Sequence, residues 1–111
     1  MTPPDEPRVE APGARRAARI AFSTMAAELL DHYPAARWVH ARSDGDTLHI
    51  LSVTDEAGAE VPGAADSFTA LYASTGTPEG PLIRAEHVLE GEPEARLDLR
   101  AVAAWNTLPG A

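Results

Sequence analysis

The chain has no cysteine and no lysine, and its 111 residues include only two each of tryptophan, tyrosine and phenylalanine. The lack of cysteine excludes disulfide bonds, thiolate zinc sites and cysteine nucleophiles. Because aromatic side chains supply much of the buried area of a domain, their scarcity predicts a thin core of small side chains. No apolar run approaches the ~20 residues of a membrane-spanning helix or follows a basic N-terminal segment, so we expect a cytoplasmic protein.

Negative charge dominates the composition, with nine basic residues, all arginine, against 17 acidic residues and a formal net charge of −8. The excess lies in the second half, where ten acidic residues stand against two arginines between positions 54 and 98. An acidic field repels nucleic acid and anionic membranes, and it suits solubility or contact with a basic protein surface. We therefore expect a protein partner, and neither nucleic acid nor a membrane.

The first thirteen residues, MTPPDEPRVEAPG, mix proline and charge without an apolar period. This pattern predicts a disordered tail at 1–13, followed by a single domain at 14–111. Apolar residues at helical spacing predict an amphipathic helix from Ala14 to Tyr33, which Pro34 ends. The same spacing predicts a second helix from Ala64 to Ser74.

A β-hairpin is the clearest local prediction. Two strand-like runs, 37–42 and 47–53, flank an Asp-Gly pair that accepts the positive φ angles of a tight turn. The expected register places His40 opposite His49. Because residues two apart share a face of a strand, one face is apolar and the other is amphipathic. The amphipathic face carries Trp38, His40, Arg42, Thr47, His49 and Leu51.

The rest of the chain predicts further strands and a last helix. Residues 82–89 alternate in hydropathy, and after a polar turn a second strand-like run covers 95–100, so a second hairpin is expected. A short additional strand within 54–61 and a terminal helix over 101–108, with Trp105 on the core, complete the pattern. The order α-β-β-(β)-α-β-β-(α) predicts an α+β fold, in which a small antiparallel sheet built from two β-hairpins has helices on one face.

The opposed histidines are the first candidate site. Imidazoles opposed across two strands have Cβ atoms ~5 Å apart, close enough to share a divalent ion or to repel when protonated. A third ring from His87 on a neighbouring strand could complete a metal site, and Asp46 could complete a small catalytic site. No helical HxxxH or close HxH spacing supports a metal, so we predict no metal and no cofactor. The chain also lacks GxSxG, HExxH and phosphate-binding glycine motifs, which favours a protein without catalytic activity.

Two charged clusters offer alternatives. Three arginines, Arg15, Arg16 and Arg19, could bind phosphate, but cations are unfavourable at a helix N-terminus and we interpret them as a solvated face. Five carboxylates could imitate DNA phosphates in an acidic inhibitor of a basic nucleic-acid-handling protein; they are Glu86, Glu90, Glu92, Glu94 and Asp98. Arginines interrupt this run, and a solvated turn explains it equally well.

The hypothesis that we favour is a non-enzymatic interaction or regulatory module, self-associating as a homodimer through the outer hairpin face. Aromatic and arginine side chains are the usual anchors of interfaces, which selects Trp38, His40, Arg42, His49 and Leu51 as the interaction residues. The acidic inhibitor, and a small enzyme or metal site at the histidines, remain the alternatives.

Overall fold

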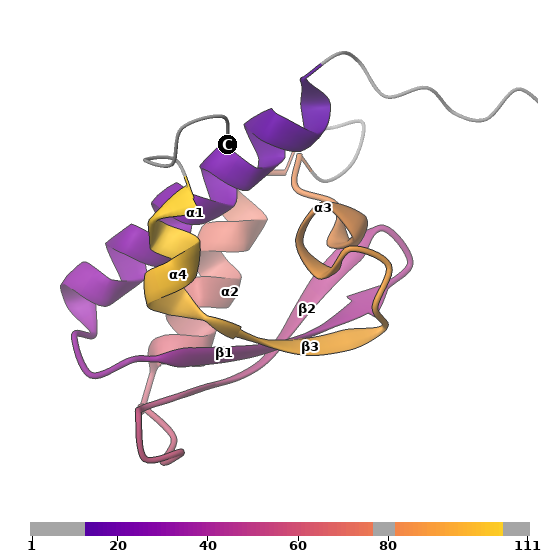
Figure 1. Cartoon of the computed structure of the whole chain (residues 1–111). Coiled ribbons are helices and arrows are strands. Elements are labelled where there is room, and N and C mark those ends of the chain that lie inside the picture. The colour runs from indigo at the N-terminus through magenta and orange to yellow at the C-terminus, as the bar shows by residue number, and fades with distance from the viewer. Residues whose placement is uncertain (1–12, 77–81, 106–111) are drawn as a thin grey trace, which may run out of the picture.

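The computed structural model describes residues 13–76 and 82–105. In chain order the elements are α1 (Ala14–His32), β1 (Trp38–Asp44), β2 (Thr47–Thr54), α2 (Ala64–Ser74), α3 (Ala85–Leu89), β3 (Glu94–Asp98) and α4 (Leu99–Ala103). The strands form one antiparallel sheet in the order β2-β1-β3, and the helices lie on one side of it (Figure 1). The predicted α+β class, with helices packed against a small antiparallel sheet, is confirmed. The predicted tail lies outside the described residues except for Gly13.

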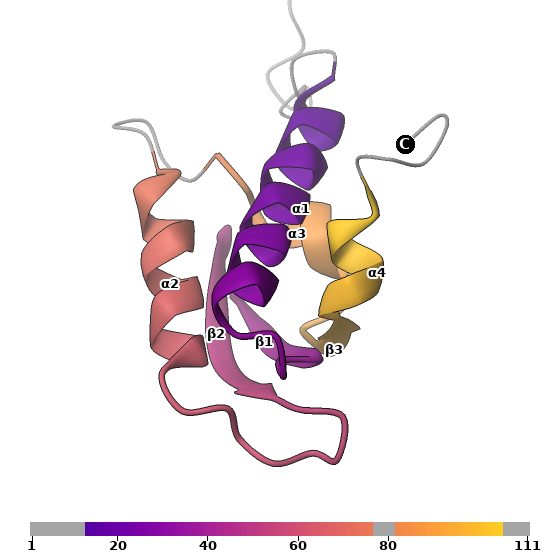
Figure 2. The same cartoon turned by 90° about the vertical axis from the view of Figure 1, so that its left-hand side faces the viewer.

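The two long helices begin and end where the sequence predicts, apart from one residue at the end of α1. Each follows a glycine with a positive φ angle, Gly13 at 84° and Gly63 at 80°. In Figure 2, α1 lies between α2 and α4. Phe22 of α1 is fully buried, and its ring centroid lies 5.5 Å from that of Phe68 and 5.9 Å from that of Trp105. These rings connect α1, α2 and the segment after α4, and each buried phenylalanine stabilises the fold by roughly 1.5–3 kcal/mol.

The last helix starts earlier than predicted. The α4 helix covers Leu99–Ala103, because the Asp98 carboxylate accepts a hydrogen bond from the Arg100 backbone N–H and caps it there. The predicted residues 106–108 lie outside the described part of the chain. Trp105 packs against the core, as predicted.

The first hairpin forms, but its predicted register is wrong. The turn residues are Gly45, with φ 64°, and Asp46, so Arg42 pairs with His49 and Asp44 with Thr47. Beyond Ala41 the register shifts at a bulge that leaves Leu51 without a partner, and His40 then pairs with Ser52. A turn placed one residue later moves the pairing by two residues, which preserves the face of every side chain. The two faces are therefore as predicted up to Leu51, beyond which the bulge places Ser52 and Thr54 on the outer face and Val53 on the inner face. The opposition of His40 to His49 is lost.

The second predicted hairpin does not form. Ala85–Leu89 is the α3 helix, in which four of the five side chains are buried, including three in succession from His87 to Leu89. A strand alternates its side chains between two faces, so it cannot bury three successive residues on one side. The predicted run at 95–100 instead contributes β3, which pairs with β1. The additional strand within 54–61 is reduced to one bridge, between Thr54 and Glu60.

None of the helices within residues 13–76 and 82–105 is both long enough and apolar enough to cross a bilayer.

Candidate interaction surface on the sheet

We define the outer sheet face as the side of the sheet away from the helices. The register places on it Trp38, His40, Arg42, Asp44, Thr47, His49, Ser52, Thr54, Glu94, Arg96 and Asp98, and the exposed bulge residue Leu51 lies with them. All five predicted interaction residues are in this set. The inner side buries Val39, Ala41, Leu48, Ile50 and Val53 under the helices. The outer sheet face thus has no helix over it in the described ranges (Figure 1).

Trp38 is half-buried and lies between two arginines, Arg37 directly before β1 and Arg96 in the middle of β3. The guanidinium carbon of Arg96 lies 4.4 Å from the indole ring centroid, and that of Arg37 lies 5.3 Å from it. Guanidiniums within ~6 Å of an indole are attracted by its π electrons. These contacts restrict the orientation of the ring, which lowers the entropy lost when a partner covers it.

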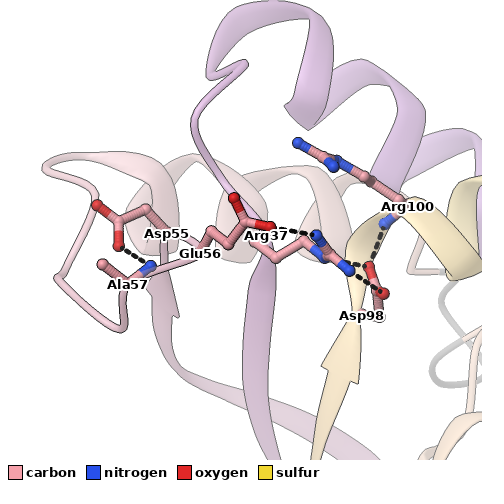
Figure 3. Close-up of polar contacts among 6 residues, drawn as sticks. All are labelled: Arg37, Asp55, Glu56, Ala57, Asp98 and Arg100. Atoms are coloured by element: carbon pink, nitrogen blue, oxygen red, sulfur yellow. Dashed lines mark hydrogen bonds and ion pairs between the residues drawn. The ribbon is translucent and has the colours of Figure 1, made fainter.

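Arg37 is fixed at the edge of this face by Asp98. Its Nε and Nη2 donate to the two carboxylate oxygens of Asp98, each at 3.1 Å, and its Nη1 donates to Glu56 at 3.3 Å (Figure 3). Asp55 accepts from the backbone N–H groups of Ala57 and Ala59 at 2.9 Å, which orders the loop carrying Glu56. Partial burial acts to raise the pKa of Asp98, but the hydrogen bonds from Arg37 and Arg100 and the charge of Arg37 outweigh it, so that pKa lies below its usual value.

The histidines occupy three different environments. His40 lies opposite Arg96 and Ser52, and its Nε2 is 2.6 Å from the Glu94 carboxylate. His49 is exposed and lies opposite Arg42. His87 is buried in α3, where its Nδ1 accepts from the backbone N–H of Arg84. The proposed meeting of His87 with the strand histidines is therefore wrong, and residues 13–76 and 82–105 contain no group of three or more His, Cys, Asp or Glu arranged to hold a metal ion.

Two residues of the predicted arginine cluster of α1 contact other parts of the protein, although Arg15 and Arg16 are exposed, as the predicted solvated face requires. Arg15 forms an ion pair with Glu90 at 2.7 Å, and Arg19 lies 3.8 Å from the same carboxylate. Arg19 also donates to the carbonyl of His87 and covers the Trp105 ring, 3.8 Å from its centroid. These contacts connect α3 and Trp105 to α1, so two of the three arginines, Arg15 and Arg19, form contacts within the protein.

The acidic run is similarly engaged. Four of its five carboxylates lie within ion-pair distance of a cationic or titratable side chain, in the pairs Glu86–Arg84, Glu90–Arg15, Glu94–His40 and Asp98–Arg37. A mimic of the DNA backbone must present its carboxylates to a partner. These pairings weigh against the acidic-inhibitor hypothesis, and local sequence patterns contain no sign of them.

A groove of about 590 Å³ separates α1 from α2. Its walls include Leu29 and Leu71, with Glu28 and His32 among the polar residues. The hydroxyls of Tyr33 and Ser67, also in its wall, lie 3.0 Å apart and bond to each other. The groove therefore combines apolar and polar walls, but all five predicted interaction residues lie on the outer sheet face, which is the stronger candidate.

Sequence reasoning missed the residues that β3 adds to the surface. Glu94, Arg96 and Asp98 join the predicted five because β3 pairs with β1. Their alternation with Ala95 and Leu97 placed them on a polar face, but no local signal identified the strand with which they pair.

Comparison with known proteins finds no matching protein-family model, no matching curated protein and no matching solved structure.

Proposed function

We propose that the protein is a non-enzymatic interaction module that self-associates through its outer sheet face. The observation that carries the proposal is the one-sided packing of the helices, which leaves Trp38 partly exposed and Leu51 with 36% of its surface exposed on an uncovered sheet. Burial of apolar surface stabilises an interface by roughly 25 cal/mol per Å² before the costs of association. Two stacked copies would form a symmetric four-layer arrangement with both sheets inside.

The charges of this face support a contact between identical copies. The face and its edge carry three arginines, Arg37, Arg42 and Arg96, against four carboxylates; these are Asp44, Glu56, Glu94 and Asp98. The formal net charge of the chain is −8, so the remaining surface of one copy repels that of another. Both signs are present on the outer sheet face, which allows Glu94 of one copy to meet an arginine of the other.

The sheet edges are less suited to self-association. Antiparallel pairing of two β3 strands centred on Arg96 would oppose the two Arg96 side chains and place Glu94 against Asp98 of the other copy. At the β2 edge, the backbone N–H of Leu48 already donates to the Tyr72 hydroxyl, and the carbonyl of Val53 accepts from Val61. These arrangements direct association to the face of the sheet.

The dimensions of the face predict weak binding. Its strands have five to eight residues, which at a rise of ~3.3 Å per residue and a spacing of ~4.8 Å gives roughly 15 by 20 Å. This footprint is smaller than the ~800 Å² that each partner buries in a standard interface. We therefore expect a reversible dimer with a Kd in the micromolar range.

Sedimentation velocity over a range of micromolar concentrations tests the proposal. The wild-type protein should show a concentration-dependent monomer–dimer equilibrium, and the double variant Trp38→Ala/Leu51→Asp should remain monomeric with an unchanged far-UV circular dichroism spectrum. Leu82→Asp is the matched control, because Leu82 is also an exposed leucine, at 45%, but lies in the segment before α3. A monomeric wild-type protein throughout, or a double variant that dimerises normally, would refute the proposal.

A further inference from the structure

The two edges of the sheet differ in how they are covered. At the β2 edge, the outward backbone groups of Leu48 and Val53 bond to Tyr72 of α2 and to Val61. The other edge is formed by β3, which lies at one side of the sheet and has no strand beyond it within the described residues (Figure 1). An edge strand whose backbone groups are unpaired can accept a strand from another chain. The β3 edge is therefore the edge at which a further strand can be added.

The backbone of β3 presents hydrogen-bonding groups at this edge. The carbonyl of Pro93, directly before β3, accepts from the Ser43 N–H on the β1 side at 2.8 Å. Backbone groups of successive residues in a strand point to opposite sides, so those of Glu94 and Arg96 point away from β1. No hydrogen bond joins these groups to another element within residues 13–76 and 82–105. The register with β1 has no bulge, so the edge is regular along β3.

The side chains of β3 determine which strand fits beside it. On the inner side, Ala95 and Leu97 pack against the core but are only half-buried. Apolar residues of an added strand opposite them would complete their burial. On the outer side, Arg96 lies between Glu94 and Asp98, so the charges alternate in sign along the edge.

Arg96 is the residue of this edge whose charge is open to a partner. Its guanidinium lies over the Trp38 ring, and in the described part of the chain no carboxylate is within ion-pair distance of it. Glu94 and Asp98 have partners in their own chain, but a carboxylate can accept from several donors. Opposite charges attract across paired strands and like charges repel. An acidic residue therefore fits opposite Arg96, with basic residues two positions to either side.

We infer that the β3 edge binds an extended segment of a partner protein in which basic, apolar, acidic, apolar and basic residues follow one another. The segment adds a fourth strand to the sheet, and main-chain hydrogen bonds supply much of the attraction. The formal net charge of −8 further favours a segment with an excess of basic residues. A second copy of β3 does not fit, because it would oppose Arg96 to Arg96. The inference does not rest on the proposed self-association, since the edge of the sheet and its outer face are different surfaces.

An NMR titration of the isotope-labelled protein with the capped peptide Lys-Val-Glu-Val-Lys tests the inference. The amide signals of Glu94 and Arg96 should shift, and their N–H groups should exchange more slowly with solvent because they become hydrogen-bonded. The control peptide Val-Lys-Glu-Lys-Val has the same composition and net charge, but it places lysines beside Ala95 and Leu97. It should bind at least about fivefold more weakly.

A charge reversal in the protein tests the pairing itself. Arg96→Glu should weaken binding of Lys-Val-Glu-Val-Lys by about fivefold or more. Arg16→Glu is the matched control, because Arg16 is an exposed arginine of α1 and its reversal changes the net charge equally. The peptide Lys-Val-Lys-Val-Lys should bind Arg96→Glu more tightly than Arg16→Glu. Far-UV circular dichroism checks that both variants are folded.

Four results would overturn the inference. They are the absence of any signal change at millimolar peptide, the largest changes at another surface such as the groove between α1 and α2, equal binding of the two first peptides, and unaltered binding by Arg96→Glu. None of these results bears on self-association, which sedimentation velocity tests in the absence of peptide.

Discussion

Removal of the Tyr72 hydroxyl is the sharpest test of the packing between α2, β2 and the segment before α3. This hydroxyl donates to the carbonyl of Ile83 at 2.6 Å and accepts from the backbone N–H of Leu48 at 3.0 Å, and both contacts are buried. In Tyr72→Phe the ring still fills its place, but both main-chain groups lose their partner.

The expected loss of stability follows from these two bonds. A protein hydrogen bond contributes ~1 kcal/mol net, and a buried polar group left without a partner costs about 1–3 kcal/mol. Two buried main-chain groups without a partner give an expected loss of ~2–4 kcal/mol. The free energy of unfolding of a small domain is only about 5–15 kcal/mol, so the effect is large.

Urea unfolding followed by circular dichroism measures this loss, with Tyr33→Phe as the matched control. The Tyr33 hydroxyl bonds to Ser67 Oγ at 3.0 Å in a partly buried position, where Ser67 can turn to water instead. The control should lose under ~1 kcal/mol. Equal losses in the two variants, or a loss below ~1 kcal/mol in Tyr72→Phe, would refute the reasoning.

The wild type and Tyr72→Phe can also be compared at alkaline pH. Burial is the main cause that raises the pKa of Tyr72 above 10.0, with a further increase from Asp46 and an opposing effect of the bond from Leu48. The resulting stabilisation is complete below pH 10.0 and is lost as the pH rises from there through the pKa of the folded state. The difference in stability between wild type and Tyr72→Phe should therefore narrow above that pH.

Two further predictions concern the ends of the sheet and of α2. Asp98→Asn retains the cap of α4 and loses the ion pair with Arg37, so Asp98→Ala should be ~1 kcal/mol less stable than Asp98→Asn in urea unfolding; equal stabilities would contradict the cap. Because the pKa of Asp98 is lowered from 3.8, its stabilisation is present above that pH and is lost as the pH falls further, so Asp98→Asn should flatten the acid limb of the stability profile. Gly63→Ala combines a φ of 80° with a Cβ placed 3.2 Å from the Tyr33 hydroxyl, whereas Gly58, at 88°, has open space. Gly58→Ala should therefore cost only the ~1 kcal/mol of backbone strain and Gly63→Ala more, and the reverse order would contradict the close contact.

Local patterns predicted the elements that local forces determine. Phe22, Met25 and Leu29 recur at helical spacing between Gly13 and Pro34, so α1 could be predicted without knowledge of its tertiary contacts. The two faces of the first hairpin were also predictable, because the alternation of side chains does not depend on the pairing partner. The register required the position of the turn and of the bulge at Leu51, and neither has an unambiguous sequence signal.

The α3 helix was missed for a different reason. The alternation of residues 82–89 is also compatible with a short helix buried on most sides, and a five-residue helix has too few turns to show its period. The candidate site was predicted on one strand pair and missed on the third strand. Its ion pairs, such as His40 with Glu94, depend on which strands meet, and residue spacing within either strand contains no information on that.

The central position of β1 has a consequence for the order in which the chain can fold during synthesis. The second neighbour of β1 arrives only with β3, and His40 and its partner Glu94 are 54 residues apart. In a chain emerging from the ribosome, α1 and the first hairpin can form early. One edge of β1 then stays unpaired until the C-terminal segment with β3 has been synthesised. During that interval, β1 can accept the β3 strand of another copy, so a high local concentration of nascent chains favours exchange of β3 between copies.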